Sequence, residues 1–299
     1  MAIGDPVSAA RTNNLQSRVA TVLGSGAGSF GYGQGVSSSQ VSVGALADND
    51  DLSDIYADML KIGTHQTGSA PSLIAPINDM DLIGDETSTG PQSGRKGIAD
   101  FENLMSAYET NRFVLDPSQA VLTSATSSTR GSAWNGSITH IFDVSWSNSD
   151  QIRTFFNAGG EVRFVAARSG GNSTAKNSDW SSLLSTMGTV RFGPTNTVST
   201  GTGVETSVGY FDLTGSNQVI FRQQGSSYAE NRYIVYAYLL NPTTIRFQVT
   251  FDDFDTGDGF GVEIDENVNG TIQSVITQYR AAGTYVTASP GNYTAVSNL

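Results

Sequence analysis

The sequence contains no cysteine, only two histidines among its 299 residues, and no long apolar run. The absence of cysteine excludes disulfide bonds, thiolate metal sites and a cysteine nucleophile. The apolar runs all stay below the roughly 18 residues that a membrane-spanning helix needs. The first residues also lack the basic and apolar regions of a signal peptide. We therefore expect a protein that is made in a cytoplasm and has no membrane partner.

Basic residues are scarce: the chain has 16 Lys and Arg and 28 Asp and Glu, which gives a formal net charge of −12. No segment gathers Lys or Arg into a basic patch of the kind that neutralises a phosphate backbone. The sequence therefore predicts no nucleic-acid partner, and the acidic excess favours solubility and repulsion between copies.

What the chain has in abundance is glycine, 33 residues, together with Ser and Thr, while charged residues make up only 15%. This composition is typical of turn-rich β structure. The clearest pattern lies in residues 138–171, where near-strict alternation over 138–146 predicts a half-buried strand. A short helix with Ile152, Phe155 and Phe156 on one face follows, and after Gly159 and Gly160 the alternation resumes over 162–166. We interpret this stretch as a packing unit without catalytic groups, in which His140 is a core histidine.

Further strands are expected at 204–212, 218–223, 232–240, 244–252, 271–280 and 285–288, and a helix capped by Ser178 is expected to end at Gly188. In the strand at 233–240, both the odd-numbered and the even-numbered residues are apolar or aromatic, so we expect other parts of the protein to pack on both faces of this strand. One face packs on the sheet core, and the other packs on the short helices, on the N-terminal section or on a neighbouring subunit. The predicted fold is mainly β with α, with an antiparallel β-sandwich or jelly-roll-like C-terminal domain after a short helical section.

The N-terminal section reads as three short amphipathic helices joined by glycine-rich and proline-containing connections. The first is expected to start at Asp5–Pro6 and end at Gly24, the second to run from Asp48 to Gly63, and the third to pack Ile98 and its partners. We place a domain boundary between residues 1–120, a docking section, and 121–299. Because short helices cannot bury their stripes alone, these helices pack on each other, on the β domain or on another copy. The candidate interface residues are Leu15, Val19, Val22, Leu52, Ile55, Tyr56 and Met59.

Two features of this section resemble functional motifs only superficially. The glycine-rich loop at 25–40 follows no strand and lacks the spacing of a phosphate-binding loop, so we expect a flexible loop. His65 follows Gly63 and has no acidic partner at helical spacing, so we expect a hydrogen-bonded loop histidine and no metal ligand.

Carboxylates gather densely only between residues 252 and 266. Oxygen ligands at short spacing around glycines suit Ca²⁺, and the candidate ligands are Asp252, Asp253, Asp255 and Asp258. The segment does not match the twelve-residue EF-hand loop, however, so a solvated hairpin loop without any ion or other cofactor is the favoured alternative. The same carboxylates form the basis of a further hypothesis, a glycan hydrolase.

Several segments taken together resemble a known class of proteins: DPVSAARTNNLQSRVATVLG with FGYGQ, then SAWNGSITH, FFNAGGEVRF, NSDWSSLLSTMGTVRF, TIRFQVTFDD and TQYRAAGTYV. They resemble virion structural proteins of contractile-tailed bacteriophages, especially those of marine cyanobacteria, over most of the chain. The resemblance implies a non-enzymatic, multi-copy component of the neck, tail, baseplate or fibres, with no catalytic residues. It also implies synthesis in the host bacterial cytoplasm, location in the virion, and partners that are other copies and other virion proteins. We expect the chain to self-assemble and to dock to neck or tail proteins through its N-terminal section. The first alternative is a receptor- or carbohydrate-binding module that contacts a host surface glycan, and the second is the hydrolase.

Overall fold

The computed structural model describes residues 8–42, 44–45, 47–78, 83–84, 96–254 and 266–298. The chain divides into two compact units. Unit 1 comprises Met1–Val121, Arg153–Gly160 and Arg280–Ser289, and unit 2 comprises Leu122–Ile152, Glu161–Tyr279 and Pro290–Leu299. The longest segment of unit 1 therefore corresponds to the helical section expected from the sequence, but two later segments belong to the same unit.

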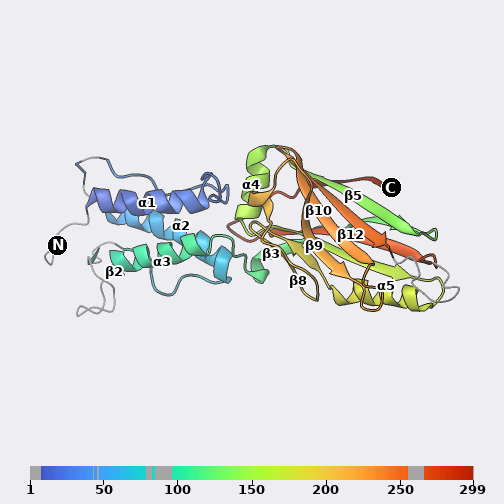
Figure 1. Cartoon of the computed structure of the whole chain (residues 1–299). Coiled ribbons are helices and arrows are strands. Elements are labelled where there is room, and N and C mark those ends of the chain that lie inside the picture. The colour runs from blue at the N-terminus through green and yellow to red at the C-terminus, as the bar shows by residue number, and fades with distance from the viewer. Residues whose placement is uncertain are drawn as a thin grey trace. The chain divides into compact units, whose positions relative to one another are not determined.

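Unit 1 is built on three helices, α1 (Ala9–Leu23), α2 (Asn49–Thr67) and α3 (Ile98–Thr110) (Figure 1). Helix α1 begins at Ala9 because the Ser8 hydroxyl accepts a hydrogen bond from the backbone N–H of Arg11, at 3.3 Å, and it ends before Gly24 as expected. The predicted start at Asp5–Pro6 lies outside the described residues.

Helix α2 corrects two predictions. It does not end at Gly63 but runs on to Thr67, and Gly68 ends it in the left-handed conformation, with φ at +75°. Gly63 lies inside the helix, where a Cβ atom would clash with the phenol oxygen of Tyr108. The glycine therefore permits close packing of α2 on α3, and His65 is a helical residue instead of a loop residue.

The three helices run parallel to one another. Arg11 and Arg18 on α1 pair with Glu102 and Glu109 on α3, so both helices advance by seven residues in the same direction. The C-terminal ends of all three helices meet at Tyr32. Its backbone N–H donates a hydrogen bond to the Val22 carbonyl at the end of α1. Its hydroxyl donates to the Arg112 carbonyl, just after α3, and accepts a hydrogen bond from the Gln66 side chain on α2. Parallel helices need long return connections, which accounts for the loop-rich sequence between them. One connection contains a two-residue parallel pairing, β1 (Ile83–Gly84) with β2 (Lys96–Gly97).

Unit 2 contains two antiparallel sheets, as the sequence predicted for a β-sandwich. The five-stranded sheet has the order β13-β5-β11-β10-β9, and the second sheet has the order β3-β12-β6-β7-β8, with β4 also paired to β12. The strands are β3 (Ala120–Leu122), β4 (Thr126–Arg130), β5 (Gly136–Ser145), β6 (Glu161–Ser169), β7 (Val190–Phe192), β8 (Thr197–Ser199), β9 (Gln218–Gln224), β10 (Arg232–Asn241), β11 (Thr244–Asp253), β12 (Thr271–Ala281) and β13 (Asn292–Asn298).

Aromatic rings hold the two sheets together. The ring of Phe247 on β11 lies 5.0 Å from that of Phe164 on β6 and 5.3 Å from that of Phe192 on β7, measured between centroids. Residues 138–171 form most of β5, helix α4 (Ser149–Asn157) and β6, as their alternation and helical spacing predicted. Strands β5 and β6 belong to different sheets, so this stretch connects the two layers.

Several local predictions in unit 2 are wrong. Helix α5 (Ala175–Thr186) is capped by Thr174, and Ser178 lies within it. Residues 204–212 form only isolated bridges at Val204 and Thr206 and a short 3₁₀ turn at Tyr210–Asp212, and residues 285–288 form only a bridge at Thr287. The strands β4, β8 and β13 carry too few apolar residues to be recognised by alternation, and the apolar β3 is too short, at three residues, to show a period.

Candidate functional site

The candidate interface residues of the helical section are mostly inside unit 1. The side chains of Leu15, Val19, Val22, Leu52, Ile55 and Met59 are fully or almost fully buried, and Tyr56 is half-buried. Of the three modes of cover expected from the sequence, packing of the helices on each other is the one that the structure shows. The six buried side chains contact another chain only if the bundle opens, whereas Tyr56 is partly exposed.

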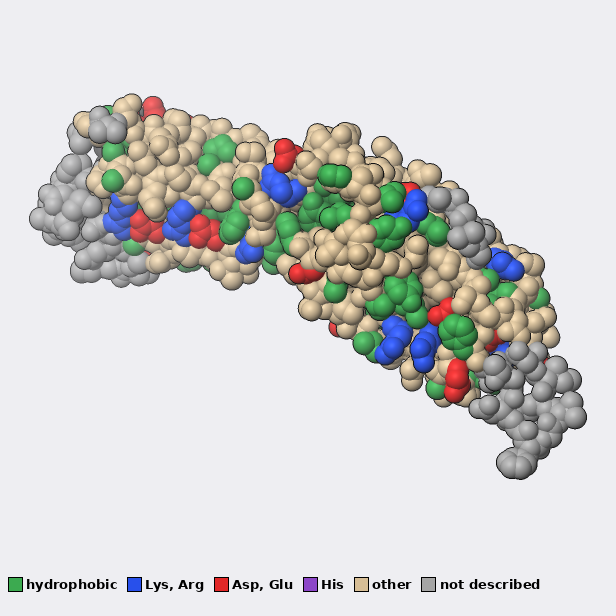
Figure 2. All heavy atoms as spheres, turned by 45° about the horizontal axis from the view of Figure 1, so that its top comes forward, with side chains coloured by type: hydrophobic (Ala, Val, Ile, Leu, Met, Phe, Trp, Pro, Cys, Tyr) green, Lys and Arg blue, Asp and Glu red, His purple; other side chains and the backbone are tan. Residues whose placement is uncertain are grey.

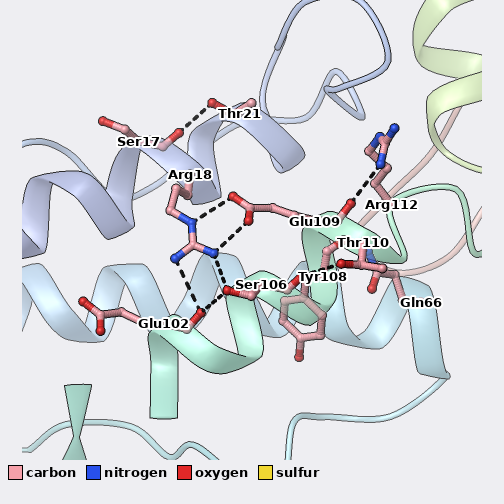
Figure 3. Close-up of polar contacts among 10 residues, drawn as sticks. All are labelled: Ser17, Arg18, Thr21, Gln66, Glu102, Ser106, Tyr108, Glu109, Thr110 and Arg112. Carbon is pink, nitrogen blue, oxygen red and sulfur yellow. Dashed lines mark hydrogen bonds and ion pairs between the residues drawn. The ribbon is translucent and has the colours of Figure 1, made fainter. Parts of the chain in front are cut away.

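The surface of the bundle instead presents a row of alternating charges, visible along the helical unit in Figure 2. Arg11 makes a bidentate pair with Glu102, at 2.7 and 2.8 Å, and Arg18 makes one with Glu109, at 2.9 and 2.7 Å. Figure 3 shows Arg18 also reaching the Ser106 hydroxyl at 2.8 Å. The hydrogen bond from Arg11 lowers the pKa of Glu102, although partial burial opposes this shift. Because the charges pair within the chain, this row positions α1 against α3.

The glycine-rich loop at 25–40, which we expected to be flexible, is held by hydrogen bonds from several side chains of unit 1. Arg153 donates to the carbonyls of Phe30 and Ser25, both at 2.6 Å, and Asn157 donates to the Phe30 carbonyl at 2.8 Å. Arg112 donates to the Ser29 carbonyl at 2.8 Å and lies over the Phe30 ring. A phosphate-binding loop presents backbone N–H groups to its ligand, whereas this loop presents carbonyl oxygens to basic and amide side chains.

A buried carboxylate holds the next part of that loop. Asp58 on α2 has a fully buried side chain and accepts hydrogen bonds from the N–H groups of Ser37 and Ser38, between 2.8 and 3.0 Å. Lys61 completes the site with an ion pair of 2.7 Å. These hydrogen bonds to its charged form lower the pKa of Asp58 against the opposing effect of burial, so the carboxylate has a structural role.

The two histidines are buried in different units. His65 stacks on Tyr32, with ring centroids 4.6 Å apart, and neither ring nitrogen has a hydrogen-bond partner. Burial lowers the pKa of His65 to about 4. His140 on β5 is a core residue as predicted: its Nδ1 lies 2.9 Å from the Ser274 hydroxyl, and burial, assisted by the charge of Arg130, lowers its pKa to about 4.

The acidic segment begins where β11 ends. Asp252 accepts a hydrogen bond from the Ser137 hydroxyl at 2.5 Å, and Asp253 pairs with Lys176 at 3.4 Å. The other candidate calcium ligands, Asp255 and Asp258, lie outside the described residues. Asp252 and Asp253 are buried and already engaged, which weakens the repulsion that made a cation attractive. Within the described ranges, no group of three or more His, Asp or Glu side chains is arranged to hold a metal ion.

The most unusual exposed surface is the side of the five-stranded sheet that faces away from the sandwich core, which we call the outer face. On β10, which lies between the central strand β11 and the edge strand β9, its residues are the buried Ile234, the half-buried Tyr236 and Tyr238, and the exposed Leu240. An antiparallel sheet normally carries polar side chains on such a face. Val219 on β9 lies beside Tyr236, and both Val219 and Leu240 are 43% exposed.

Polar pairs flank these apolar side chains. Arg246 on β11, opposite Tyr238, makes a bidentate pair with Asp143 on β5 at 2.7 and 2.8 Å, and the pKa of Arg246 is raised by this interaction. Gln248, opposite Tyr236, accepts from the Asn217 amide at 2.9 Å. The two-sided pattern of residues 233–240 pointed to this strand, but its neighbours across the sheet were not recognised, because strand pairing is not visible in the sequence.

Comparisons with known proteins add no relative: no family model, no curated protein and no solved structure matches the chain. Among the helices in the described part of the chain, none is long and apolar enough to cross a membrane.

Proposed function

We propose that this chain is a non-enzymatic structural component of a tailed bacteriophage particle, and that its copies associate through the outer face of the five-stranded sheet. The class of protein comes from the sequence resemblance. The observation that carries the assembly role is the row of apolar and aromatic side chains on the outer face, Ile234, Tyr236, Tyr238 and Leu240.

The composition of this face suits a protein partner. Tyrosine and arginine are enriched in protein interfaces and supply much of their binding energy, and aliphatic side chains fill the space between them. Tyr236, Tyr238 and Arg246 occur here beside Val219 and Leu240. Because Arg246 and Asp143 already pair with each other, a partner can cover them without leaving an unpaired buried charge.

The charge of this face also favours a second copy as the partner. The whole chain has a formal charge of −12, which opposes association. On the outer face, however, Arg232 lies opposite Asp252, Arg246 lies opposite Asp143, and Arg222 lies opposite Ile234, so three positive and two negative charges leave +1. Two copies therefore repel each other less through this face than through the acidic remainder of the surface.

A second candidate function rests on a separate feature of the same face. Tyr236 and Tyr238 are two residues apart on one strand and therefore lie side by side, next to the Asp143–Arg246 and Asn217–Gln248 pairs. Aromatic rings that stack on a sugar ring, with planar polar groups for its hydroxyls, are the elements of a carbohydrate-binding surface. A host surface glycan is the corresponding ligand.

The test of the assembly role compares charge substitutions on and off the outer face by sedimentation velocity. Val219→Asp with Leu240→Asp is expected to shift the protein to a smaller species. The matched control, Leu73→Asp with Leu122→Asp, adds the same charge at two other exposed positions, 68% and 58% exposed, and is expected to leave the assembly unchanged. Equal behaviour of the two double variants would contradict the proposed surface.

A further inference from the structure

A buried lysine and a buried aspartate meet inside unit 2 at the edge of the aromatic core. Lys176 is the second residue of α5 and is 3% exposed, and Asp253 is the last residue of β11. Four residues after Lys176, Trp180 contacts Phe251, which precedes Asp253 by two. The pair therefore lies on the same face of the helix and the same inward face of the strand as this aromatic contact, and water has little access to it.

The geometry of this pair differs from that of the arginine–carboxylate pairs described above. The Lys176 Nζ atom lies 3.4 Å from Oδ1 and 3.5 Å from Oδ2 of Asp253, so it is almost equidistant from both oxygens. The Arg11–Glu102 and Arg246–Asp143 pairs close to 2.7 Å. A nitrogen that approaches both oxygens equally, at a distance longer than a strong charge-assisted hydrogen bond, faces the carboxyl group as a whole, including its carbon.

Burial changes the chemistry of such a pair. Two charges without water are expensive, and transfer of one proton from the ammonium to the carboxylate replaces them with a neutral amine and a neutral acid. A neutral amine is a nucleophile, and a carboxylic acid, unlike a carboxylate, has an electrophilic carbon. Two reacting groups held together in a dry site react far more readily than in solution.

We propose that Lys176 and Asp253 condense to an intramolecular amide crosslink. The Nζ atom forms a bond to Cγ of Asp253, and the bond between Cγ and one carboxyl oxygen breaks. That oxygen leaves as water with the carboxyl proton and one amine proton, so the step needs no oxidant, reductant or other reactant.

Asn231 is suited to assist as a positioning residue. The β10–β11 pairing ends with Arg232 opposite Asp252, and Asn231 and Asp253 are the residues that come next on the two segments. Asn231 is buried, and its side-chain carbonyl accepts a hydrogen bond from the backbone N–H of Phe254, the residue after Asp253, at 3.0 Å. A carboxamide donor at such a place stabilises negative charge that develops on an attacked oxygen.

The crosslink would connect α5 to the five-stranded sheet across a sequence separation of 77 residues. A covalent bond between distant residues restricts the unfolded chain in the way a disulfide does. This chain, which has no cysteine, would obtain the same benefit from Lys176 and Asp253.

The test is the intact mass of the full-length protein, measured under denaturing conditions after purification. The expected mass is lower than that of the sequence by one water molecule. Proteolytic digestion is expected to yield a branched peptide that joins the segments containing Lys176 and Asp253. Because the protein is denatured before measurement, the result for the natural sequence does not depend on how any variant folds.

Two substitutions separate the crosslink from other losses of water, such as cyclisation at an Asp–Gly sequence. Lys176→Arg removes the nucleophile and is expected to restore the full sequence mass. Lys61→Arg, at the other buried aspartate pair, is expected to retain the loss. The full mass in the natural protein, a loss of ammonia in place of water, or a loss that persists in Lys176→Arg would each overturn the proposal.

Discussion

Acid should destabilise unit 1 through His65, and this can be measured separately from unit 2. The unfolded chain protonates this histidine near its ordinary pKa of 6.5, whereas burial holds the folded pKa at about 4. The unfolded state therefore binds the proton first as the pH falls. The free energy of unfolding is highest above pH 6.5, decreases below it, and stops decreasing through this group near pH 4.

The magnitude follows from the size of the shift. One pKa unit corresponds to about 1.4 kcal/mol, so a shift from 6.5 to about 4 is worth on the order of 3 kcal/mol in total. Between pH 7 and pH 5 the expected loss is about 2 kcal/mol. The pKa values of Asp58 and Glu102 are lowered from their ordinary values, so these groups lose their contribution only at more acidic pH.

The assay is urea unfolding at pH 7 and pH 5, followed by two probes. All three tryptophans, Trp134, Trp146 and Trp180, belong to unit 2, so tryptophan fluorescence reports on that unit. Far-ultraviolet circular dichroism reports mainly on the helices of unit 1. His65→Phe keeps a ring on Tyr32 but cannot bind a proton, so it is expected to remove the acid sensitivity from the dichroism transition alone.

His140 provides the matched control, because it is also buried with a pKa of about 4 but belongs to unit 2. His140→Phe is expected to change the pH dependence of the fluorescence transition and to leave the dichroism transition as it was. If the stability of unit 1 still falls between pH 7 and pH 5 in His65→Phe, protonation of His65 is not its cause.

Three further predictions concern stability at neutral pH. Gly63→Ala is expected to destabilise unit 1, although alanine has the higher helix propensity, because the new methyl group clashes with the phenol oxygen of Tyr108. Adding Tyr108→Phe, which removes that oxygen, is expected to restore part of the lost stability, and thermal unfolding of the two single variants and the double variant checks this. Asp58→Ala should cost about 3 kcal/mol or more since it leaves buried donors unpaired, whereas Arg18→Ala should cost about 1 kcal/mol or less, as measured by urea unfolding. Arg153→Ala removes two hydrogen bonds to loop carbonyls and should cost about 2 kcal/mol and speed amide exchange in residues 25–31.

The elements with a strong apolar period could be predicted from the sequence. The stripe with Leu15, Val19 and Val22 predicted α1, and the alternation of residues 244–252 predicted β11 almost to its ends. These patterns are local, and they determine which residues become buried in a helix or strand. The sandwich followed from their number and order.

The partner of each buried stripe could not be predicted in the same way. The apolar faces of α1 and α2 suited a neighbouring subunit as well as each other, and only the tertiary structure shows that they pack within unit 1. Helix ends were misjudged for a similar reason, since Gly63 serves the contact with Tyr108 and does not end α2.

The partners of the candidate site residues could not be predicted from the sequence either. The carboxylates of Asp252 and Asp253 resembled bare ligands in the sequence, but their partners Ser137 and Lys176 come from distant segments. Equally, the outer face combines residues from β5, β9, β10 and β11, of which the sequence pattern identified only β10.

The most direct test of the account is the mass of the intact, purified protein in solution, measured by light scattering over a wide range of concentrations. Association through the outer face predicts a species of more than one subunit that persists on dilution and becomes smaller in Val219→Asp with Leu240→Asp. A single-subunit mass at every concentration would contradict self-association and favour the glycan-binding alternative for the same face.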